Sequence, residues 1–176
     1  MNAKTSLHIT MDEELAMAME DPQEDYTPYL DVNNNELVWI SNVLRDEWDE
    51  MDNDQWETIL KKANNEEPLT TYEEDLLKIY DVESKHEENY LLVETIPHWT
   101  GYEDMKAFID GIEDMQLREK LERSIQGKGA FRRFKDAIGR RSGLEKTWFR
   151  FKRNQQRTRI AAWLAKNGVS CTFNDL

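Results

Sequence analysis

The stretch YTPYLDVNNNELVWIS, residues 26–41, decides the fold, because it predicts a β-hairpin in a chain that otherwise favours helices. Residues 29–32 and 36–40 are strand-like runs with aromatic and β-branched side chains. Three asparagines separate the two runs, and asparagine tolerates the positive φ of a tight turn better than most residues. The pattern therefore predicts two antiparallel strands joined by a short turn.

Helical periodicity surrounds the hairpin. Residues 41–85 are expected to form acidic helices, residues 89–97 a third strand that ends at Pro97, and the last helix to run from about Leu144 to Gly168. Three capping boxes, each a threonine followed three residues later by a glutamate, mark expected helix starts: Thr10 with Glu13, Thr71 with Glu74, and Thr100 with Glu103. We therefore expect an α+β fold, with a small antiparallel sheet of about three strands packed with helices and a C-terminal half that is all-helical and basic.

The length of 176 residues suits a single domain over residues 1–176. Within it we expect two subdomains, an acidic α+β part over 1–100 and a helical, basic part over 101–168, followed by a tail over 169–176.

Charge is distributed very unevenly along the chain, whose net charge is −13. Residues 1–117 contain 7 Lys and Arg against 31 Asp and Glu, whereas residues 118–166 contain 16 against 4. Two explanations compete: the two parts pack on each other, or the basic part is exposed to a polyanion.

The stretch GKGAFRRFKDAI, residues 127–138, places glycines and cations at an expected helix start. Gly127 and Gly129 would let backbone N–H groups converge on an anion, and Lys128, Arg132 and Arg133 would add charged donors. In the alternative interpretation Gly127 caps one helix, Gly129 opens the next, and the cations are solvated or meet acidic helices. The stretch is not a Walker A motif, because no Lys-Ser/Thr follows the second glycine.

The last helix carries a second basic feature, a stripe of cations spaced four, three and four residues apart: Lys146, Arg150, Arg153 and Arg157. An apolar set suited to the core is expected on the opposite face: Leu144, Trp148, Phe151 and Ala162. A basic stripe opposite an apolar face is typical of a helix that binds a nucleic-acid backbone, and also of a helix docked against acidic neighbours.

The sequence gives little support to catalysis, and we expect neither cofactor nor metal. The acidic run 45–57 lacks the glycine and ligand spacing of a calcium loop, and the three histidines, His8, His86 and His98, are not spaced as zinc ligands. Cys171, the single cysteine, is expected to be a spectator thiol. With no apolar run of membrane-spanning length and no signal peptide, a soluble, cytoplasmic protein without membrane contact is expected.

Four segments resemble the bacterial Uncharacterised Protein Family 0158: YLDVNNNELVWIS, YLLVETIP, GKGAFRRFKDAI and WFRFKRNQQRTRIAAWL. The resemblance covers roughly residues 9–167. The chain differs by having Lys128 where the family generally has Arg, and GRRSG at 139–143 where a Pro-containing turn is common. The resemblance implies no activity, substrate or cofactor.

Our leading hypothesis is a non-catalytic binding or regulatory protein whose basic face contacts nucleic acid or another phosphate-rich partner. Its candidate residues are Gly127, Lys128, Gly129, Arg132, Arg133, Lys146, Arg150, Arg153 and Arg157. Four core aromatics are expected to hold the face rigid: Phe131, Phe134, Trp148 and Phe151.

Two alternatives remain open. One is an interaction adaptor whose acidic N-terminal surface binds a basic protein partner, with the basic helices satisfied internally. The other is an enzyme that binds a small phosphoester at the Gly127–Gly129 turn.

Overall fold

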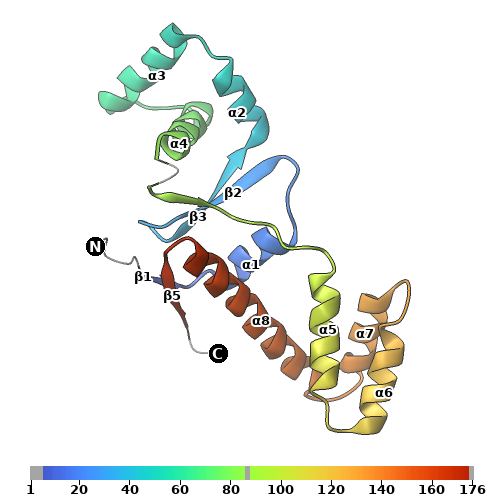
Figure 1. Cartoon of the computed structure of the whole chain (residues 1–176). Coiled ribbons are helices and arrows are strands. Elements are labelled where there is room, and N and C mark those ends of the chain that lie inside the picture. Colours follow the sequence, from blue (N-terminus) through green and yellow to red (C-terminus); the bar gives the residue numbers. More distant parts are fainter. Residues whose placement is uncertain (1–5, 86–87, 175–176) are drawn as a thin grey trace.

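The computed structural model describes residues 6–85 and 88–174 and has an α+β fold, as predicted (Figure 1). Its strands are β1 (Ser6–Ile9), β2 (Tyr26–Asp31), β3 (Glu36–Ser41), β4 (Tyr90–Leu92) and β5 (Ser170–Phe173). Its helices are α1 (Asp12–Glu20), α2 (Asn42–Asp49), α3 (Asn53–Asn64), α4 (Thr71–Lys85), α5 (Thr100–Asp110), α6 (Met115–Ser124), α7 (Ala130–Gly139) and α8 (Leu144–Lys166).

The predicted hairpin forms two strands of a three-stranded antiparallel sheet with the order β3-β2-β4, in which β2 is central. Leu30 of β2 pairs with Leu37 of β3 on one side and with Leu91 on the other. In the turn, the Asp31 carboxylate accepts hydrogen bonds from the backbone N–H groups of Asn33 and Asn34, at 2.9 and 3.1 Å. Asparagine also supplies the turn's positive φ, 56° at Asn35, so the interpretation of the asparagine run is confirmed.

A second, two-stranded sheet was not predicted. β1 pairs in parallel with β5, with Ser6 opposite Ser170 and Ile9 opposite Phe173. The segment 169–176, expected to be a tail, thus contributes a strand, and the C-terminal half is not all-helical. Cys171 lies on this strand, where burial raises the pKa of its thiol.

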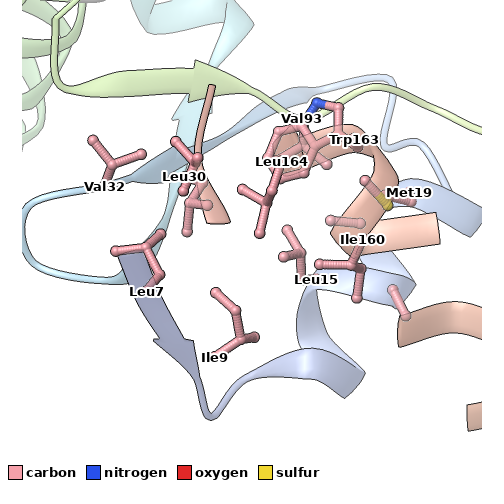
Figure 2. Close-up of a cluster of buried hydrophobic side chains, with 13 residues drawn as sticks. Leu7, Ile9, Leu15, Met19, Leu30, Val32, Val93, Ile160, Trp163 and Leu164 are labelled. Atoms are coloured by element: carbon pink, nitrogen blue, oxygen red, sulfur yellow. The ribbon is translucent and has the colours of Figure 1, made fainter. Parts of the chain in front are cut away.

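The buried apolar side chains form three clusters. The central one joins β1, α1, β2, the segment after β4 and the second half of α8, and Figure 2 shows Leu15, Leu30 and Ile160 pointing into it. A second cluster lies between the α2–α4 helices and the hairpin, with Ile40 and Leu76 at its centre.

The third cluster is built by α5, α6, α7 and the first half of α8. Phe134 is 1% exposed, and its ring lies 6.1 Å from that of Phe108 and 4.8 Å from that of Trp148, both edge-on. Because α8 packs into this cluster with its first half and into the central cluster with its second, it connects the two (Figure 1).

The predicted end points of the last helix are confirmed, but the capping boxes are not. α1 and α5 begin after Met11 and Trp99, without a side-chain cap. At α4 the box lies one residue earlier than predicted. The Thr70 hydroxyl accepts from the Glu73 N–H at 3.2 Å, and the Thr70 N–H donates to the Glu73 carboxylate at 2.8 Å.

Across residues 6–85 and 88–174, no helix is long and apolar enough to cross a membrane. The same residues include no group of three His, Cys, Asp or Glu side chains arranged to hold a metal ion. His86 lies outside the described residues.

Candidate functional site

The turn between α6 and α7 binds a cation of its own chain, the exposed Arg133. Gly127 and Gly129 have φ values of 73° and 76°, which favour glycine, and Gly129 opens α7 as expected. α6 is capped by Ile125, not by Gly127.

Arg133 binds the carbonyl groups of this turn. Its Nε donates to the Ser124 carbonyl at 3.0 Å, and its other nitrogens donate to the carbonyls of Gln126 and Lys128. The carbonyls thus converge on a guanidinium. An anion site at this turn would instead need backbone N–H groups that converge on the ligand. Arg133 holds the turn and is removed from the candidate binding face.

The middle of α8 is neutralised by α1. Asp12 is 3% exposed, and its carboxylate accepts from Nε and Nη2 of Arg153, both at 2.8 Å, and from Nε of Arg157 at 2.5 Å. The hydrogen bond from Arg153 is the largest cause that lowers the pKa of Asp12 from 3.8 to about 2; desolvation opposes it, and Arg157 adds to it. Arg153 and Arg157 are therefore internal cations, as the adaptor hypothesis expected of the basic helices.

Other cations of α8 are also paired within the chain. Lys152 donates to Glu20 at 2.9 Å, Lys166 donates to Glu94 at 2.6 Å, and Arg159 forms an ion pair with the buried Asp104. The carboxylates that neutralise α8 come from α1, α5 and the segment after β4.

The acidic helices α2–α4 make their ion pairs among themselves. Lys62 binds Glu73 at 2.6 Å and lowers the pKa of that carboxyl to about 2, and Arg45 binds Glu83 at 3.0 Å. In the described part of the chain, no carboxylate of these helices forms an ion pair with α7 or α8. The acidic and basic parts thus neutralise each other only in part.

Among the solvent-exposed Lys and Arg of the basic part, five on α7, on α8 and on the turn before α7 form neither an ion pair nor a side-chain hydrogen bond with any described residue. They lie on the α6–α7 turn, on the first two turns of α7 and on the first two turns of α8: Lys128, Arg132, Lys135, Lys146 and Arg150. We call them the exposed cations. Four of them belong to the predicted candidate set, and Lys135 comes from the same stretch.

A pocket of about 260 Å³ lies among α7, α8 and the start of α5. Its lining includes Phe131 and Lys135 from α7, Phe149 and Lys152 from α8, and Gly101. Phe131 and Phe149 are 49% and 54% exposed, and we call this the aromatic pocket. A shallower groove of about 520 Å³, lined by Phe149, Lys152 and Arg150 among others, adjoins it.

The prediction that Phe131 belongs to the core is therefore wrong, whereas Phe134 and Trp148 are buried and Phe151 packs against them. Ala162, expected on the apolar face of α8, is exposed. The buried stripe of α7 runs through Ala130, Phe134 and Ile138, and Phe131 lies about 60° from its centre line, at the edge of the stripe.

Sequence reasoning missed Phe149, although a signal was present. In the run Trp148-Phe149-Arg150-Phe151, a helix places Phe149 about 100° from Trp148, on the side away from Phe151. A single buried stripe that contains Trp148 and Phe151 therefore leaves Phe149 outside it.

These features define an α+β protein that presents exposed cations and aromatic rings beside a helical core. The chain belongs to the Uncharacterised protein family (UPF0158), whose sequence model matches residues 66–176. The match covers α4, β4, α5–α8 and β5, and it leaves the hairpin, part of the resemblance noted in the sequence, outside.

A UPF0158 protein of Chlamydia pneumoniae is 29% identical over 104 residues, which cover 58% of this chain and 32% of that protein. The aligned part of the chain thus spans about a third of the length of this curated relative. No solved structure gave a significant match.

Proposed function

We propose that the chain is a non-catalytic binding protein of the cytoplasm that contacts nucleic acid through the exposed cations. The observation that supports this most directly is that these five side chains form no ion pair in the described structure, although the chain contains 36 Asp and Glu. Between residues 128 and 150, eight Lys and Arg accompany only two carboxylates, Asp136 and Glu145. A cluster of unpaired cations attracts a polyanion such as a phosphate backbone.

The internal ion pairs support this function indirectly. Arg153 and Arg157 fix α8 on α1, and Arg133 fixes the start of α7, so the exposed cations extend from anchored helices. The acidic surface of α2–α4 repels phosphates, which restricts contact to the basic face.

Salt dependence provides the first test. If four of the exposed cations contact phosphates of a duplex, the slope of log K against log salt is about −3.6, and affinity falls roughly a hundredfold between about 50 and about 200 mM salt. Fluorescence anisotropy with labelled single- and double-stranded DNA and RNA measures this fall. Absence of binding at high micromolar protein would contradict the proposal.

A charge-reversal pair localises the contact. Lys146→Glu with Arg150→Glu should abolish binding without unfolding the protein, because neither side chain has an ion-pair partner among the described residues. The matched control is Lys61→Glu with Lys78→Glu, which makes the same charge change on the acidic helices, where both lysines are exposed. Equal loss in the two variants would mean that net charge alone governs binding.

The adaptor hypothesis retains one specific observation in its favour: the acidic helices are not neutralised by the basic part. In that case the protein would bind a lysine-rich peptide, and reversing Glu47 and Asp54 would weaken this binding, while labelled nucleic acid would not bind at any salt concentration.

A further inference from the structure

Two half-exposed phenylalanine rings line one pocket beside unpaired cations. Phe131 comes from α7 and Phe149 from α8, and both line the aromatic pocket together with Lys135. Burying a phenylalanine is normally favourable. Two such rings exposed at one place therefore indicate a binding surface for an apolar, planar group.

The rings are held in place by regular helices. A Cβ atom at Gly101 of α5 would lie 3.1 Å from Cζ of Phe131, so the ring of Phe131 packs closely against this glycine and would have to shift by a few tenths of an ångström for a larger residue. Phe149 follows the buried Trp148, which also lines the pocket and packs edge-on against Phe134. Two stacking surfaces on anchored helices need little ordering when a ligand binds.

The charge around the rings favours an anion. Two carboxylates lie near them, but Lys152 and Gln156 donate to Glu20 at 2.9 and 2.7 Å, and Arg153 binds Glu13 at 3.1 Å.

Lys135 in the pocket and Arg150 in the adjoining groove form no ion pair with a described residue. The place thus combines planar apolar surfaces with two uncompensated positive charges.

Resting on the proposed function, we infer that the ligand is a single-stranded nucleic acid whose bases stack on Phe131 and Phe149 while its phosphates contact Lys135 and Arg150. Aromatic platforms beside a positive groove are how proteins bind single strands without reading their sequence. The bases of a duplex are stacked on each other and cannot reach such rings. The pocket volume of about 260 Å³ lies just below the range of small-molecule sites, about 300–1,000 Å³, which suits one planar base.

The test compares a single strand with a duplex of the same sequence and length, as DNA and as RNA, by fluorescence anisotropy. We expect the single strand to bind at least tenfold more tightly than the duplex. Phe131→Ala and Phe149→Ala should each weaken single-strand binding by about ten- to a hundredfold and leave the salt slope unchanged. Lys135→Gln should instead make the slope shallower by about 0.7.

Two controls make the result specific. Tyr72→Ala removes an exposed ring from the acidic helix α4 and should leave binding unchanged. Phe149→Leu keeps the apolar character of the side chain but not the ring, and should behave like Phe149→Ala. All five substitutions replace exposed side chains, and unchanged melting temperatures confirm that the fold is intact.

The outcomes separate the two proposals. Salt-dependent binding that is equal for single strand and duplex, and insensitive to the phenylalanine variants, overturns this inference and leaves the proposed function standing. No binding of any nucleic acid overturns both. Stronger binding of RNA than of DNA would identify the single-stranded ligand as RNA, recognised through contacts to the 2′-hydroxyl.

Discussion

The carboxylate of Asp12 should contribute more to stability than any exposed ion pair of the chain. It is 3% exposed and accepts three hydrogen bonds from Arg153 and Arg157. Asp12→Asn keeps the side-chain volume but removes the charge. Breaking a buried ion pair costs about 3–5 kcal/mol. Because Arg153 is 34% exposed and keeps Glu13 as a partner, we expect the lower end, about 3 kcal/mol.

The pH dependence checks the cause of this loss. The pKa of Asp12 in the folded state, about 2, lies below its ordinary value of 3.8. This shift corresponds to roughly 2 kcal/mol of folding stability from the ionised carboxylate. This stabilisation is fully present above about pH 4 and is lost as the pH falls through about 2. The difference in unfolding free energy between Asp12→Asn and the unaltered chain should therefore narrow towards pH 2.

Urea unfolding followed by tryptophan fluorescence, at several pH values from 7 to 2, measures both effects. Glu13→Gln is the matched control, because Glu13 binds the same Arg153 but is 74% exposed. It should cost less than about 1 kcal/mol. The reasoning is refuted if Asp12→Asn costs no more than this control, or if its cost is the same at pH 2 and at pH 7.

Three further experiments, with five substitutions in all, test the turn and the helical cluster by thermal or urea unfolding. Phe134→Ala should lower the free energy of unfolding by about 3–5 kcal/mol, because it opens a cavity beside two aromatic rings. Phe131→Ala should lower it by less than about 1 kcal/mol, because this side chain is half exposed. Similar losses in the two variants would contradict the assignment of the buried face. Arg133→Lys should cost about 1–2 kcal/mol, because an ammonium cannot reach several carbonyls as a guanidinium does, and an unchanged midpoint would show that the turn holds without it. Gly129→Ala should cost about 1 kcal/mol because of its φ of 76°, while Gly139→Ala, with open space around it, should be neutral or stabilising; the opposite order would be inconsistent with the turn geometry.

The hairpin and the last helix could be predicted because their signals are local. An asparagine run between two apolar runs determines the turn, and Gly168 ends α8. The capping box at α4 shows the limit of such signals. Thr70 with Glu73 and Thr71 with Glu74 both fit the motif, and the structure forms the first pair.

The candidate site was predictable only in outline. The even spacing of the stripe on α8 does not distinguish Arg150, which is exposed, from Arg153, which α1 engages. That difference depends on Asp12, 141 residues earlier in the chain. Contacts over such a separation leave no periodic pattern in either segment. For the same reason the pairing of β1 with β5 could not be predicted.

That pairing has a consequence for the order in which the protein matures on the ribosome. β1 leaves the exit tunnel well before its hydrogen-bonding partner, residues 170–173, is translated, because most of the described chain lies between the two strands. The α5–α7 cluster and the first half of α8 contain only neighbouring segments and can assemble while translation continues. The central cluster must wait for its closing strand, so a nascent chain stalled before residue 170 would expose Leu7 and Ile9 to chaperones.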